Sequence, residues 1–153
     1  MEDDVNITVS GGTFYGTGGI YAGGRADGLG TSLVEGIVSV EISNITVQAG
    51  ANWTIFGGGY VSGSGISTVD NEVSITISGR KNKIYGKLNI FGAGDAKVKE
   101  SGQSSVESVV IYIGEAAKES KLTLNNVYGG GWGKATVSGD THIVFTGYGS
   151  IAM

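Results

Sequence analysis

The sequence predicts an all-β protein, a right-handed parallel β-helix (β-solenoid) of about four coils, with 32–37 residues and three short strands per coil. Residues 1–153 are expected to form it as a single domain. Valine and isoleucine together number 31 and leucine only 5, and β-branched side chains fit pleated sheets better than helices. There are 29 glycines and no proline, which suits strands paired on both sides and joined by tight turns. A repeated pattern along the chain is the third observation.

The first strand of each coil is predicted by apolar residues that alternate with other residues. The pattern occurs in five segments: 5–9, 38–42, 73–77, 109–113 and 141–145. Their starts lie 33, 35, 36 and 32 residues apart. A period of two places the apolar side chains on one face of a strand. We therefore expect Val40, Ile75 and Ile111 to stack in one inward column.

The second strand of each coil is predicted by a β-branched residue, an aromatic residue and then small residues. It occurs in four segments: 20–24, 55–59, 90–94 and 127–131. These segments are spaced by 35, 35 and 37 residues. A third strand is marked by a valine shortly before the next alternating segment, at Val34, Val69, Val106 and Val137. The shared spacing predicts that successive coils stack in register.

Stacking is favoured because one unit of short strands cannot bury its apolar face alone, whereas stacked units bury a continuous core. The alternative is a glycine-rich β-prism or β-sandwich of the lectin type. Those folds close with two or three units, and this repeat is longer. The ends of a solenoid are open sheet edges, so end-to-end or edge self-association is a candidate interaction.

Composition argues against several classes of function. Cysteine is absent and His142 is the single histidine, so we predict no metal site. No helix is expected after Gly16-x-Gly18-Gly19, so this segment is no dinucleotide fingerprint and no cofactor is predicted. The net charge of −4 argues against general nucleic-acid binding. No segment stays apolar for the roughly 18 residues that a membrane helix needs, so we expect no membrane insertion.

The N-terminus begins Met-Glu-Asp-Asp, without a basic region or an apolar run, so no signal peptide is expected there. A predicted strand follows almost at once. This start favours a fragment of a longer extracellular chain over a cytosolic protein.

Two pairs of segments carry a resemblance to a known kind of repeat. Segment 73–79 with 90–94, and 109–114 with 127–131, each place an alternating strand before an apolar-aromatic-glycine strand. This unit resembles the glycine-rich "VYGGG" repeats of large bacterial surface or secreted proteins. The resemblance implies an extracellular, adhesin-like β-solenoid and assigns no functional residue. The first unit departs most, because Ala22 replaces a glycine.

The residue after each small-residue segment provides the first candidate binding surface. These residues are Arg25, Tyr60, Asp95 and Trp132. In register they would stack along one corner and offer the aromatic rings and charged groups that sugar recognition uses. Unrelated choices at freely varying turn positions are the alternative explanation. Trp132 lies between two glycines and is predicted to be uncovered.

Two further surfaces repeat along the chain. One is an aromatic ladder of Tyr21, Phe56, Phe91 and Tyr128. Its strict repetition favours stacking inside the β-helix or against a loop, and an exposed ladder would instead bind glycans or another chain. The other is a basic patch of Arg80, Lys81, Lys83, Lys118 and Lys121. Stacked in one turn, these would suit sulfated or carboxylated glycans, although a solvated turn also explains such a run.

The predicted function is a non-catalytic, adhesin-like or glycan-binding module of a bacterial surface protein, with host or dietary glycans as partners. Glycoside hydrolysis needs two carboxyl groups that converge. Asp27, Asp70, Asp95 and Asp140 lie in different turns, so no catalytic residue is predicted. A structural spacer without a ligand is the alternative function, and a fragment of a polysaccharide-acting enzyme is the third.

Overall fold

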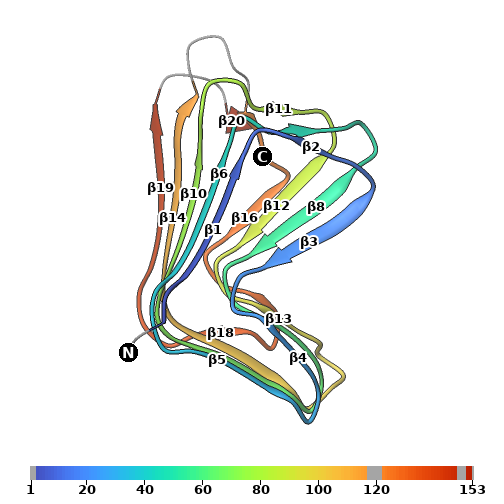
Figure 1. Cartoon of the computed structure of the whole chain (residues 1–153), viewed down its shortest axis with the longest axis vertical. Coiled ribbons are helices and arrows are strands. Elements are labelled where there is room, and N and C mark those ends of the chain that lie inside the picture. The colour runs from blue at the N-terminus through green and yellow to red at the C-terminus, as the bar shows by residue number, and fades with distance from the viewer. Residues whose placement is uncertain (1–2, 117–121, 148–150, 153) are drawn as a thin grey trace.

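The computed structural model describes residues 3–116, 122–147 and 151–152, and within them the chain is all-β without a helix. Parallel strands stack as a β-solenoid of about four turns (Figure 1). The predicted fold class is confirmed. Every pairing between the described strands is parallel, which excludes the lectin-type alternatives because those are built from antiparallel strands.

The alternating segments form one face of the solenoid, the long sheet. Its main strands are β1 (Val5–Ser10), β6 (Val38–Ser43), β10 (Ile66–Ser78), β14 (Gln103–Ala116) and β19 (Thr141–Gly147). Ile75 pairs with Val40 on one side and with Ile111 on the other, and all three side chains are fully buried. The predicted inward column is therefore confirmed. The intervening residues, such as Thr76, face outward.

Two further sheets carry the residues of interest. The aromatic sheet consists of β3 (Thr17–Tyr21), β8 (Asn52–Phe56), β12 (Lys87–Phe91) and β16 (Asn126–Tyr128). The corner sheet consists of β4 (Arg25–Gly28), β9 (Tyr60–Gly63), β13 (Asp95–Ala96) and β17 (Trp132–Gly133).

Each full coil contains more strands than the three that the repeat predicts. The first coil, for example, has five strands, β1–β5. The corner sheet is one addition. A bridging sheet of β2 (Thr13–Phe14), β7 (Thr46–Val47) and β11 (Lys83–Ile84) is the other, and β15 (Leu122–Thr123) pairs separately with β20 (Ile151–Ala152). The valine-bearing strands are β5 (Thr31–Val34), the starts of β10 and β14, and β18 (Thr136–Val137). Alternation could not predict most of the additions, because strands of two residues show no period.

Two apolar clusters hold these layers together. The main core contains side chains from the long, bridging and aromatic sheets, including Ile75, Val47 and Ile55. A smaller cluster of Ala26, Val61 and Ala96 belongs to the corner sheet. Small side chains allow this sheet to approach the valine-bearing strands closely, and Figure 1 shows the two running together into a narrow arm. The arm turns away from the aromatic sheet, so the two sheets meet at an angle that opens outward.

Candidate functional site

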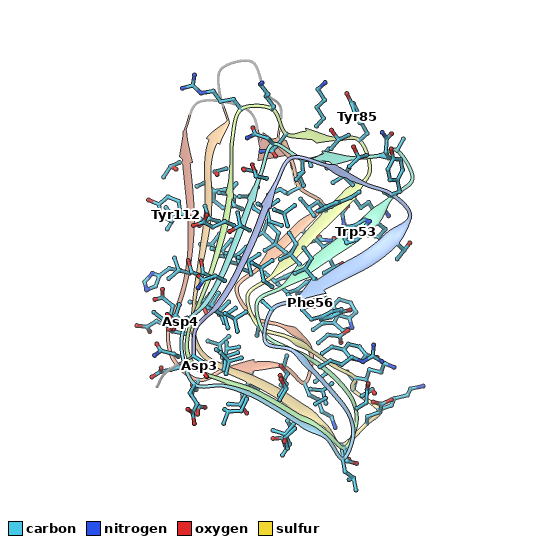
Figure 2. The ribbon with its side chains drawn as sticks, in the orientation of Figure 1. Asp3, Asp4, Trp53, Phe56, Tyr85 and Tyr112 are labelled. Atoms are coloured by element: carbon cyan, nitrogen blue, oxygen red, sulfur yellow. The ribbon has the colours of Figure 1, made fainter. Side chains whose placement is uncertain are left out.

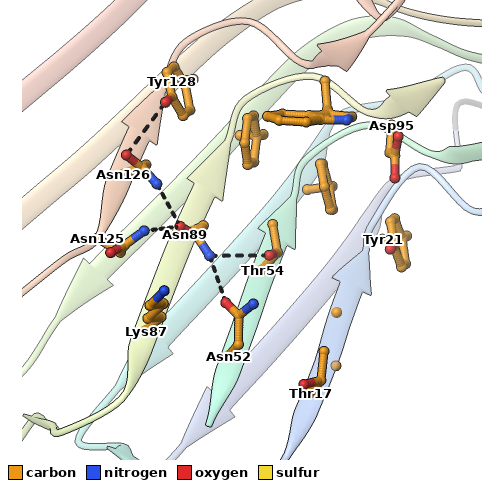
Figure 3. A pocket seen from close by; sticks show the side chains of 15 residues that line it. Thr17, Tyr21, Asn52, Thr54, Lys87, Asn89, Asp95, Asn125, Asn126 and Tyr128 are labelled. Carbon is orange, nitrogen blue, oxygen red and sulfur yellow. Dashed lines mark hydrogen bonds between the residues drawn. The ribbon is translucent and has the colours of Figure 1, made fainter. Parts of the chain in front are cut away.

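A cleft of about 540 Å³ lies in the angle between the aromatic and corner sheets, on the outside of the solenoid (Figure 3). All four coils contribute to its lining, from Thr17 in β3 to Trp132 in β17. Figure 2 shows Phe56 in this angle, whereas Tyr85 and Tyr112 project from other faces of the molecule. The cleft is therefore a feature of one side of the solenoid and follows its stacking direction.

The aromatic ladder forms one wall of this cleft. Tyr21, Phe56, Phe91 and Tyr128 pair in register, and neighbouring ring centroids lie 4.9, 5.0 and 4.8 Å apart in a stacked arrangement. The expectation that the ladder packs inside the β-helix is wrong. The preceding residue of each strand, such as Ile55, faces the core, so a period of two turns the rings outward. Mutual stacking nevertheless leaves Phe56 and Phe91 only 6% and 7% exposed, while Tyr128 is 46% exposed.

The corner column has the predicted register. Tyr60 pairs with Arg25 and with Asp95, and Asp95 pairs with Trp132. The cleft, however, is lined by Asp95 and Trp132 but not by Tyr60 or Arg25. The four predicted residues thus share one column, and two of them line the same cleft.

Tyr60 is engaged by cations. The Arg25 guanidinium carbon lies 5.1 Å from the centroid of the Tyr60 ring, and the Lys97 ammonium lies 5.8 Å from it. Arg25 also donates a 2.6 Å hydrogen bond to Asp27, which holds the pKa of the Asp27 carboxyl below its usual range. These contacts place Arg25 and Tyr60 in a polar cluster on the arm. The Tyr60 ring also meets the Tyr21 ring of the aromatic ladder edge to face, with centroids 5.3 Å apart.

Trp132 is the most accessible ring of the cleft. Its side chain is 58% exposed, and it meets Phe91 edge to face with centroids 5.8 Å apart. Close glycine neighbours and its position on the short strand β17 leave the indole uncovered, as the sequence predicts. A large apolar ring at the edge of a polar cleft is suited to stacking against a ligand.

Asp95 has a carboxylate oxygen without a protein partner. Oδ1 is buried and accepts no hydrogen bond from the described part of the chain. Burial raises the pKa of this carboxyl group, and the nearby Lys97 opposes that shift. Because unpaired buried acceptors are costly, the Asp95 carboxyl group, which lines the cleft, is a candidate acceptor for a ligand that brings a donor.

An amide network, which sequence reasoning missed, covers the outer face of the aromatic sheet. The Asn89 amide nitrogen donates to Asn52 Oδ1 at 3.1 Å, and Asn89 Oδ1 accepts from Asn125 and Asn126 at 2.8 and 2.9 Å. Tyr128 donates to Asn126 at 3.4 Å and so joins this network to the aromatic ladder. The sequence pattern that could have predicted this network is a polar residue two positions before the aromatic residue in the second, third and fourth coils. These residues are Thr54, Asn89 and Asn126.

The basic patch is only partly described. Arg80, Lys81 and Lys83 are exposed around the turn between β10 and β11. Lys118 and Lys121 lie outside the described residues. The three described patch residues do not line the cleft, whereas Lys87 does.

Comparison with protein-family models, with curated proteins and with solved structures finds no match to this chain. Within the described ranges, no helix is long and apolar enough to cross a membrane. In those same ranges, no three histidine or acidic side chains are grouped so as to hold a metal ion. The site is therefore interpreted from its own chemistry.

Proposed function

We propose that this chain is a non-catalytic, glycan-binding module of a bacterial cell-surface protein with an adhesin-like role. The observation that carries the proposal is the cleft, in which the exposed Trp132 ring, the unpaired Asp95 oxygen and an ordered amide network lie together. Sugars present apolar ring faces beside hydroxyl groups. A binding site for them combines an aromatic platform with fixed hydrogen-bond partners.

Each part of the cleft has a role in this proposal. The Trp132 indole stacks against the apolar face of a pyranose ring. Asp95 accepts a hydroxyl hydrogen bond at its carboxylate, which is stronger than a neutral hydrogen bond because the acceptor is charged. The Asn52 and Asn126 amides are held in position by Asn89 and contact further hydroxyls. Binding then uses groups that need little reorganisation.

The chemistry of the cleft supports binding without catalysis. Among the described residues that line it, Asp95 supplies a single carboxyl group. Hydrolysis of a glycosidic bond ordinarily uses two carboxyl groups on opposite sides of that bond. The bacterial surface location is supported by the resemblance of the repeat to the glycine-rich "VYGGG" regions, and the chain would be one segment of a longer secreted protein.

A glycan array tests this function with Trp132→Ala and a matched control, Tyr85→Ala. Tyr85 is 64% exposed and lies on another face. We expect the wild type and Tyr85→Ala to bind the same glycans. Trp132→Ala should lose at least about 90% of the signal, since a stacked aromatic contributes up to about 1.5 kcal/mol beyond the apolar area that it buries. All three proteins should melt within a few degrees of each other. A wild type that binds no glycan would support a structural spacer and contradict the proposal.

A further inference from the structure

We propose that the glycan is a linear, uncharged chain of about three pyranose rings, joined by equatorial linkages, which lies along the solenoid axis. This inference deepens the proposed function and rests on it. The path of the ligand across the aromatic sheet is inferred from the groups that repeat along the lining of the cleft.

The cleft presents the same kinds of group once per coil. Its polar column contains Thr54, Asn89 and Asn126, which pair in register across β8, β12 and β16. Its aromatic column runs beside the polar one, from Tyr21 in the first coil to Tyr128 in the fourth. A ligand running along the strands would leave most of these columns unused. A ligand running across the strands contacts equivalent groups in each coil.

The repeat distance of the cleft suits a sugar chain. Neighbouring rings of the aromatic column are 4.8 to 5.0 Å apart, so the three steps together span about 15 Å at the usual strand spacing. A chain of equatorially linked pyranoses is extended, and each ring advances it by nearly one such step. About three rings therefore occupy the cleft. A chain of axially linked rings curves and would leave the columns after one or two coils.

The charges of the cleft favour a neutral chain, because its described lining holds one carboxyl group, on Asp95, and one amino group, on Lys87. Asp95 places its carboxylate at the corner. A sulfate or carboxylate on the ligand would meet that group with like charge. Lys87 lies on the aromatic sheet, at the start of β12, while the exposed part of the basic patch lies around another turn. The amide network matches hydroxyl groups, which both donate and accept.

Titration calorimetry with two soluble series, β-1,4-linked glucose and β-1,4-linked N-acetylglucosamine oligosaccharides of one to six rings, tests the length and linkage. In at least one series we expect affinity to rise about tenfold from two rings to three and to change less than about twofold beyond four. The α-1,4-linked glucose series should bind at least about tenfold more weakly.

A blocking variant tests the path. Thr54→Phe places a ring at the first position of the polar column, and Thr76→Phe makes the same change on the outer face of the long sheet. We expect the first to weaken trisaccharide binding more than about tenfold and the second to leave it unchanged, with melting curves showing both folded. The length series does not depend on either variant.

The outcomes separate this inference from the proposed function. If the array finds binding only to sulfated or carboxylated glycans, or if affinity stops rising at one ring, the inference is overturned and glycan binding stands. Unchanged trisaccharide binding by Thr54→Phe would overturn the path. Binding of extended peptides with no response to any glycan would contradict both proposals.

Discussion

Asp95 combines an unfavourable environment in the free protein with a favourable position for a ligand. Its Oδ1 atom is buried without a partner, and burial raises the pKa of the carboxyl group. The folded state therefore holds this proton more tightly than the unfolded state does. As the pH rises from the ordinary pKa range of an aspartate through the raised pKa, the contribution of this group therefore lowers the free energy of unfolding of the free protein. Binding has the opposite dependence, because the ionised oxygen is the better acceptor.

Asp95→Asn separates these two effects. The variant should melt at a higher temperature than the wild type at neutral pH, because an amide of the same shape carries no charge to bury. The difference should shrink as the pH is lowered through the raised pKa toward the ordinary range of an aspartate, because the wild-type carboxyl group becomes protonated. Glycan affinity at neutral pH should fall about tenfold. Thermal melts across this pH range and calorimetry measure both, and a destabilised variant at neutral pH would contradict the argument.

At the scale of the strands, one glycine column determines how the corner sheet meets its neighbours. Gly24, Gly59, Gly94 and Gly131 precede the four corner strands, and none is replaced in any coil. A Cβ at Gly94 would clash with the Gly59 carbonyl oxygen and with Ser104 Oγ. Ser104 is buried and donates to that same carbonyl at 3.2 Å. Close approach of the backbone to the valine-bearing strands is thus the reason for glycine here.

Gly94→Ala should destabilise the fold by about 1–3 kcal/mol, the usual cost of overpacking a tight interface. Gly130→Ala is the matched control, because a Cβ there has no atom within 4 Å and its φ is not positive. The control should be neutral or slightly stabilising, since alanine reduces the freedom of the unfolded chain. Chemical denaturation measures both values. Equal effects would show that the glycine column is not tightly packed.

At the scale of the whole molecule, each coil interacts with its immediate neighbours, as expected for a solenoid. Val38 pairs with Val73, and Ser39 pairs with Ser74, so residues 39–73 make up one complete register repeat. Removing that segment joins Val38 to Ser74 and keeps every later side chain on its original face. The core columns then continue through similar residues, such as Ile7 against Ile75.

The chain without residues 39–73 should therefore fold, with β-sheet circular dichroism and a single melting transition at a lower temperature than the wild type. Removing 39–72 instead is the control. It shifts the following strand by one residue and turns its apolar side chains outward, so this protein should not fold cooperatively. If both deletions unfold the chain, its stability depends on contacts beyond neighbouring coils.

The repeated pattern along the chain predicts the solenoid and its register. Inward residues such as Ile75 alternate with outward ones, and the aromatic-glycine segments recur at nearly constant spacing. These two patterns correctly predict which residues of neighbouring coils pair with each other. The same spacing placed Asp95 beside Trp132 and Tyr60 in one column. Both predictions depend on in-register stacking, which a repeated apolar pattern specifies.

The repeated pattern does not predict which of these columns share a site. The direction that the chain takes between Phe91 and Asp95 depends on how closely glycine backbones pack, and apolar periodicity carries no information on that angle. The angle brings Trp132 and Asp95 to the amide network. Tyr60 occupies the same column and meets the Tyr21 ring edge to face at 5.3 Å, but it also lies among cations and is not part of the cleft lining.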